Sequence, residues 1–153
     1  AYRDTHGTTY WDDLVAVEKD TGDRYLGQIG RTHWLTAFAP MGVAGDVMAV
    51  VEDACCTLDL TADDLSDLAN GLSTLMIAYD KMGVYSFNMN FFTAVWGDDH
   101  FRFHLLFSPR TFFNQQLGTP DIGALRNLFN ETLCMAYPEE INARLKDGFG
   151  PEG

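Results

Sequence analysis

The chain has 153 residues, and 46% of them are hydrophobic, which is enough apolar material for a core and excludes a disordered tail. The formal net charge of −12 repels a phosphate backbone and argues against a nucleic-acid partner. No apolar run approaches the roughly 20 residues that span a bilayer, and the start does not resemble a signal peptide. We therefore expect a cytoplasmic protein without a membrane partner. No repeat or linker interrupts residues 1–153, which predicts one domain.

The first third of the chain is predicted to be rich in strands. Residues 14–17 and 24–29 flank a turn signal at 20–23, and this arrangement predicts a hairpin. An apolar segment at 34–39 follows, and residues 47–51 are typical of a buried strand. A few residues later come Cys55 and Cys56, which we interpret as reduced, buried small side chains because the three cysteines form no CxxC pair.

The clearest helix is predicted to begin at Thr61. The Thr61 hydroxyl can cap the first turn, and Asp64 can answer it as a variant of the capping box. Gly83 is the predicted C-terminal stop. Apolar residues recur every three or four positions and predict one buried stripe; they are Leu65, Leu68, Leu72, Leu75, Met76 and Tyr79.

Two alternating strands are predicted at 85–91 and 100–107, the second ended by Pro109. Short helices at about 121–129 and 138–146 would close the domain, with Pro138 well placed at a helix start. The order of strands, long helix, strands and helices predicts an α+β fold, an antiparallel sheet with helices mainly on one side.

The alternation of these two strands places Asn88, Asn90, Arg102 and His104 away from the aromatic face. Arginine and asparagine supply donors for a phosphate, and a neutral imidazole can attack phosphorus. An ordinary solvated sheet face would show the same pattern. Both interpretations remain open at this point.

Residues 98–110 (DDHFRFHLLFSPR) resemble the motif strand of the histidine-triad superfamily, in which alternating histidines are followed by a proline. The closer resemblance is to the C-terminal half of the galactose-1-phosphate uridylyltransferase family. It extends over His33–Pro40, Leu58–Thr61, Tyr79–Lys81, Phe87–Met89 and Pro138–Leu145. This resemblance implies a HIT-like antiparallel sheet with one long helix and shorter C-terminal helices packed on it.

Aligned on Pro109, His104 takes the place of the middle histidine, which is the nucleophile in catalytic members. Arg102 and Leu106 stand where the outer histidines would be. The second half-domain of the family also holds a metal, and the resemblance puts two further ligands at Leu106 and Phe92. One imidazole does not hold a metal tightly, so we expect no zinc or iron of the family type and no other cofactor.

The resemblance implies nucleotidyl transfer between a nucleoside-diphosphate sugar and a sugar phosphate, through a nucleotidyl-histidine. The candidate residues are His104 for catalysis and Asn88, Asn90, Arg102 and Arg110 for substrate binding. The expected partners are a nucleotide sugar or sugar phosphate, together with an N-terminal catalytic domain or a second copy of the chain. Acidic Glu52 and Asp53 stand where relatives commonly carry basic residues.

Alternatives stay open for each of these residues. His104 is a nucleophile, a ligand contact or a hydrogen-bonded residue without catalytic consequence. Arg102 and Arg110 bind phosphate or neutralise nearby acids such as Asp98 and Asp99. For the whole chain, the alternatives to a uridylyltransferase-like domain are a non-catalytic dimerisation or interaction module and a free-standing histidine-triad hydrolase.

Overall fold

The computed structural model describes residues 2–40, 45–110 and 136–149. Its elements are α1 (Tyr2–His6), α2 (Tyr10–Thr21), β1 (Tyr25–Ile29), β2 (Thr32–Thr36), β3 (Val47–Val51), the 3₁₀ helix η1 (Thr57–Asp59), α3 (Ala62–Lys81), β4 (Ser86–Phe92), β5 (His104–Arg110), α5 (Pro138–Leu145) and the 3₁₀ helix η2 (Lys146–Phe149). The strands form one antiparallel sheet in the order β1-β2-β3-β5-β4. The predicted α+β sheet with one long helix is confirmed.

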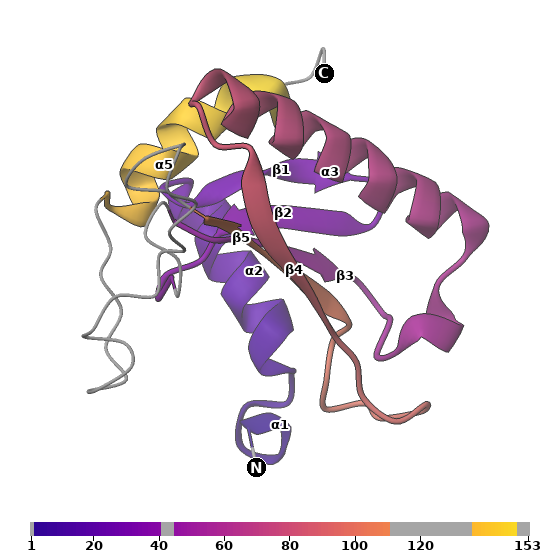
Figure 1. Ribbon diagram of the computed structural model, residues 1–153. Helices are drawn as coiled ribbons and strands as arrows, with labels where there is room; N and C mark the ends of the chain where they lie inside the picture. Colours follow the sequence, from indigo (N-terminus) through magenta and orange to yellow (C-terminus); the bar gives the residue numbers. More distant parts are fainter. Residues whose placement is uncertain (1, 41–44, 111–135, 150–153) are drawn as a thin grey trace, which may run out of the picture.

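The sheet is covered on both faces (Figure 1). The helices α3 and α5 pack on one face, over a core that contains Trp34, Leu105 and Phe107. The helix α2 packs on the other face, where Val15 meets Leu35 and Val50. No helix within the described ranges is both long enough and apolar enough to cross a membrane.

The segment predicted as the first strand is a helix, so the predicted hairpin of 14–17 with 24–29 is wrong. The Thr9 hydroxyl accepts a bond from the Asp12 backbone N–H and caps α2, and Gly22, with φ of 73°, ends it. Short apolar runs do not distinguish a strand from the buried side of a helix. Here the capping residues at both ends favour the helix. The strand β1 pairs instead with β2, through a two-residue turn at Gly30 and Arg31.

The long helix follows its prediction closely. Thr61 and Asp64 form the capping box, and Gly83 lies just beyond the end with φ of 79°. Leu68, Leu75 and Tyr79 are buried, but Leu65 and Met76 are exposed. The apolar stripe is therefore narrower than predicted, because α3 lies at the surface and contacts the sheet with only one side.

The last two strands begin and end later in the chain than predicted. The strand β5 begins at His104 rather than His100, and Pro109 lies within it instead of ending it. The pairing of β5 with β3 stops at Phe107, so the missing N–H of Pro109 removes no bond from that ladder. Pro138 opens α5 as predicted, whereas the helix predicted at 121–129 lies outside the described residues.

Candidate functional site

The register of the sheet gathers the predicted site residues on the face that carries α2. Phe92 lies opposite His104, Asn90 opposite Leu106 and Asn88 opposite Ser108. Directly opposite residues of an antiparallel pair point to the same side of a sheet. Asn88, Asn90 and His104 thus share one face, as the alternation predicted.

His104 is enclosed by aromatic rings. Only 4% of the residue is exposed, the Phe92 ring stacks on it at 4.7 Å and the Trp11 ring lies at 4.0 Å between centroids. Its Nδ1 lies 2.9 Å from the backbone oxygen of Arg102. A carbonyl oxygen only accepts, so this contact assigns the proton to Nδ1 and leaves the lone pair on Nε2. Burial, which favours the neutral ring, lowers the pKa of His104 against an opposing contribution from the Arg102 carbonyl.

Arg102 is bound within the protein. Its Nε and Nη2 donate to the two carboxylate oxygens of Asp12 at 2.9 and 2.8 Å, and Nη2 lies 3.9 Å from Asp53. This fork-to-carboxylate geometry joins the start of α2 to the segment before β5. The interpretation of Arg102 as a residue that neutralises acids fits these contacts, although the acids are Asp12 and Asp53 rather than Asp98 and Asp99.

Arg110 lies far from His104. It pairs with Ser86 at the opposite end of β5, six residues away, which is about 20 Å along a strand. Along the paired strands, Asn88 lies four residues from the position opposite His104, and Asn90 lies two residues from it. The sheet therefore brings Asn90 near His104 and leaves Arg110 at a distance that one small ligand does not bridge.

The residues around His104 do not suit the metal of the family. Leu106 and Phe92, at the expected ligand positions, are apolar, and the Phe92 ring is stacked on the imidazole. His104 is also not part of any group of three or more His, Cys, Asp or Glu with converging ligand atoms, within the described ranges. The described residues here offer a metal one imidazole, and a structural zinc site takes four ligands.

Sequence reasoning missed a polar group that lies two strands from His104. His33, buried on β2, contacts the Tyr25 hydroxyl with Nδ1 at 2.8 Å and the Glu52 carboxylate with Nε2 at 2.5 Å. Burial and the Glu52 charge raise the pKa of Tyr25 to about 12. His33 lies opposite Val50, and Val50 lies opposite His104, so only the strand order reveals that both imidazoles face α2.

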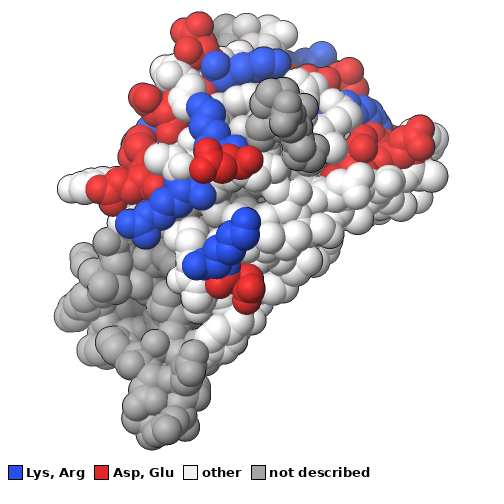
Figure 2. Space-filling model, turned by 90° about the horizontal axis from the view of Figure 1, so that it is seen from above, with Lys and Arg blue, Asp and Glu red and all other residues white. Residues whose placement is uncertain are grey.

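A pocket of about 250 Å³ lies beside this group, lined by residues of α2 and of the sheet. Its lining includes Asp12, Val15, Lys19, His33, Val50 and Glu52. The carboxylates of Asp12 and Glu52 outnumber the Lys19 ammonium, so the charges that line the pocket do not favour an anionic ligand. On the face seen in Figure 2, Lys and Arg side chains likewise lie among Asp and Glu rather than in a cationic patch of their own.

Replacing Phe92 is expected to move the pKa of His104 back up, toward the ordinary range of histidine. The stacked ring excludes water from the imidazole, and Phe92→Ala readmits it, which favours the charged form. An NMR titration of the imidazole protons measures the change. Phe91→Ala is the matched control, because Phe91 points to the other face and stacks on Phe103. An unchanged titration in Phe92→Ala, or an equal rise in the control, would contradict this account.

Comparison with known proteins gives one sequence relative and several structures. No family model matches the chain. An uncharacterised protein of Archaeoglobus fulgidus is 26% identical over 146 residues, which are 95% of this chain and 43% of that protein. The chain therefore spans less than half of this relative.

Two solved structures of a uridylyltransferase, one of them a mutant, superpose with TM-scores of 0.75 and 0.74 at 16% and 17% identity. Each covers 97% of this chain, which spans 47% and 49% of theirs. A zinc-bound histidine triad family protein from Mycobacterium smegmatis has a TM-score of 0.59 at 10% identity, over 89% of this chain and 91% of its own. The chain has the HIT-like fold of about half a uridylyltransferase, as its resemblance to that family predicted.

Proposed function

We propose that this chain is a uridylyltransferase-like half-domain that binds a nucleotide sugar or a sugar phosphate and acts together with a second half-domain. The reaction would be nucleotidyl transfer, of which galactose-1-phosphate uridylyltransferase is the model. The single observation that carries the proposal is the superposition over 97% of this chain but only 47% of a uridylyltransferase. A half of that size does not by itself account for the whole reaction.

The surroundings of His104 support a binding role rather than a nucleophilic one. Attack on phosphorus requires Nε2 to reach an α-phosphate in line with the leaving group. Burial favours the neutral form of His104 that such an attack needs, but Trp11 and Phe92 enclose its ring. Arg102, the strong phosphate donor two residues before His104, already donates to Asp12. The nucleophile is therefore assigned to the second half-domain.

Asn90 is the residue best placed to contact a ligand from this half. It is exposed on β4, on the same face as His104 and two pairs further along the ladder. An amide side chain donates to a phosphate or to a sugar hydroxyl without adding charge. This suits a chain whose acidic background makes anion binding depend on local donors.

The strand β4 also favours a second candidate function, that of an interaction module without chemistry. It lies at the edge of the sheet and no other strand pairs with its outer side in the described parts of the chain. Four of its large apolar residues are between 39% and 53% exposed: Phe87, Met89, Phe91 and Phe92. Apolar side chains along an open edge are typical of a surface that meets another domain or another copy.

Calorimetric titration of the chain with UDP-glucose, UDP and galactose-1-phosphate tests the proposal. We expect saturable binding of at least one of them, weakened at least tenfold by Asn90→Ala and unchanged by Asn70→Ala. Asn70 is the matched control because it is exposed on α3, on the opposite side of the sheet. Intact-mass analysis after incubation with UDP-glucose should show no uridylylated chain.

Two outcomes would count against the proposal in different ways. No binding up to about millimolar concentration, roughly −4 kcal/mol, would contradict ligand binding and favour the interaction module. In that case light scattering should show a dimer, and Met89→Lys should separate it. A covalent uridylyl adduct that disappears in His104→Ala would instead make His104 a nucleophile in its own right.

A further inference from the structure

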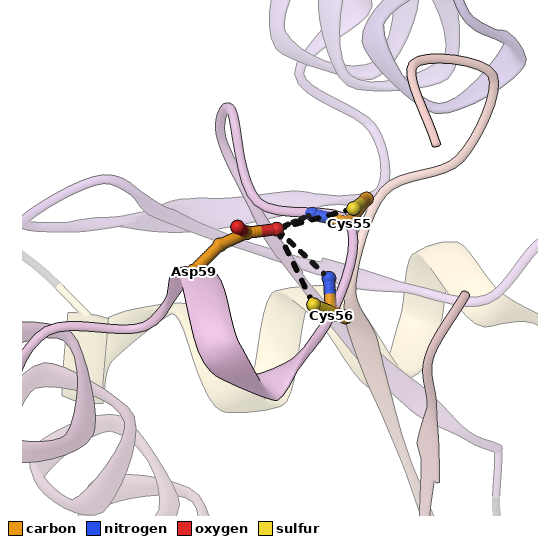
Figure 3. A group of neighbouring side chains, drawn as sticks. All are labelled: Cys55, Cys56 and Asp59. Atoms are coloured by element: carbon orange, nitrogen blue, oxygen red, sulfur yellow. Dashed lines mark hydrogen bonds between the residues drawn. The ribbon is translucent and has the colours of Figure 1, made fainter. Parts of the chain in front are cut away.

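A second group of reactive side chains lies in the segment between β3 and α3. Cys55 and Cys56 follow β3, and Asp59 is the last residue of η1, one turn later (Figure 3). The two cysteines are only 6% and 4% exposed. None of the proposed ligand contacts uses these residues.

The three side chains converge on one point. Asp59 Oδ2 accepts bonds from the Cys55 and Cys56 thiols at 3.1 and 3.6 Å, and from their backbone N–H groups at 2.9 and 3.2 Å. The two sulfurs and the carboxylate oxygen all lie within 4.8 Å of one another. Within residues 2–40, 45–110 and 136–149, this is the one group of three or more His, Cys, Asp or Glu with such spacing.

These distances suit a tetrahedral metal ion. A Zn–S bond of about 2.3 Å and a Zn–O bond of about 2.1 Å, at the tetrahedral angle, place sulfur and oxygen about 3.6 Å apart. The observed separations of 3.1 and 3.6 Å lie close to that value, so a cation can replace the two thiol protons with little movement of the backbone. Two sulfurs with one oxygen favour a thiophilic ion over Mg²⁺ or Ca²⁺.

The surroundings of the group add support from other parts of the chain. The Ala94 backbone N–H donates to the Cys55 carbonyl at 2.9 Å, and the Val95 carbonyl lies 3.5 Å from Cys55 Sγ. The segment before β5 is thus held against the cysteines and supplies another oxygen beside them. The Asp59 carboxylate forms no ion pair with a Lys or Arg side chain in the described parts of the structure, although the Arg31 guanidinium donates to the Asp59 backbone oxygen at 2.8 Å.

We propose that Cys55, Cys56 and Asp59 form a binding site for one zinc-like, thiophilic divalent cation. Binding releases one proton from each thiol to the solvent, and two thiolates, one carboxylate and the ion leave the site with one net negative charge. The fourth position is filled by a water molecule or by the Val95 carbonyl. The site holds η1 against the segment before β5, and it would be separate from the place where the family carries its own metal.

Cobalt titration of the reduced chain without oxygen tests this site, because Co²⁺ reports thiolate ligands by its charge-transfer absorption. We expect saturation at one ion per chain, displacement by Zn²⁺, and a rise in the melting temperature when Zn²⁺ is present. Cys55→Ser and Cys56→Ser should each abolish the band. Asp59→Asn should weaken binding at least tenfold while keeping an acceptor for the backbone N–H groups.

Cys134→Ser is the matched control, since it removes the third cysteine and should leave the band unchanged. Circular dichroism of the metal-free variants shows whether each serine variant is folded. If a serine variant is unfolded, alkylation of the wild-type chain tests the site instead. The proposal then predicts that Zn²⁺ slows the labelling of Cys55 and Cys56. No charge-transfer band at tenfold excess Co²⁺, a band that survives in the double serine variant, or labelling that Zn²⁺ does not slow would overturn the proposal.

Discussion

Asp64→Ala is expected to destabilise the folded chain by about 3 kcal/mol, because this buried carboxylate both pairs with Arg31 and caps the first turn of α3. Its oxygens accept from Arg31 Nε and Nη2 at 2.6 and 2.7 Å, and from the Thr61 backbone N–H and hydroxyl at 2.6 and 2.7 Å. Arg31 also donates to the backbone oxygens of Glu52 and Asp59. The variant leaves a part-buried guanidinium without its carboxylate and removes half of the capping box of α3.

Urea unfolding of Asp64→Ala, Arg31→Ala and the double variant measures the coupling free energy between the two side chains. The loss in free energy of unfolding in the double variant should be smaller than the sum of the two single losses, by about 1–3 kcal/mol. Asp63→Ala, one residue earlier and exposed, is the control and should change the free energy of unfolding by about 0.5 kcal/mol or less. Strict additivity of the two losses would contradict the coupling.

The contribution of Asp64 should depend on pH in one direction. The Arg31 guanidinium, with the Thr61 backbone N–H and hydroxyl, holds the pKa of Asp64 well below its usual range. The unfolded chain titrates this residue near pH 3.9, so the stabilisation is complete above about pH 5. Below pH 4 it should decrease by up to about 1.4 kcal/mol for each pH unit. An effect of Asp64→Ala that is equal at pH 7 and pH 3 would contradict this sign.

Gly71→Ala is expected to destabilise the fold by about 2 kcal/mol, although the same change inside an exposed helix stabilises by about 1 kcal/mol. A Cβ atom on Gly71 would overlap Cζ2 and Cε2 of Trp34. Trp34 is fully buried in β2, so its indole has no space to move into. The steric cost therefore exceeds the gain in helix propensity.

Thermal and urea unfolding of Gly71→Ala and Asn70→Ala compare neighbouring positions in the same helix. Asn70→Ala should be neutral or slightly stabilising, because Asn70 is exposed. Adding Trp34→Phe to Gly71→Ala should recover part of the loss, since the smaller ring vacates the position of the new Cβ. A Gly71→Ala variant as stable as the wild-type chain would show that Trp34 and α3 do not approach as closely as described.

Much of the fold could be predicted from local chemistry. The two alternating strands predicted at 85–91 and 100–107 correspond to β4 and β5, although β5 begins only at His104. The sequence alone does not show that the predicted hairpin of 14–17 with 24–29 is wrong, because a run of four apolar residues fits a buried strand and the buried face of a helix equally well. Asn88, Asn90 and His104 were placed on one face correctly, and their roles remain predictions.

Several features depend on contacts between residues far apart in the chain. The pairing of Arg102 with Asp12 joins positions 90 residues apart, and the enclosure of His104 by Trp11 requires α2 to lie over β5. His33 received no role from the sequence because its partners Tyr25 and Glu52 come from two other segments. The convergence of two adjacent thiols on Asp59 likewise needs the turn of η1.

The sequence by itself determined the elements whose signals lie within one turn or one strand: the cap of α3 at Thr61, its end at Gly83, and the faces of β4 and β5. These follow from backbone geometry and side-chain alternation, which act between near neighbours. Only the tertiary structure decided that Arg102 is neutralised, that His104 is enclosed, and that Asp64 binds Arg31 as well as Thr61. Burial and charge pairing are properties of the space between elements, and the packing of α2 and α3 on opposite faces of the sheet creates that space.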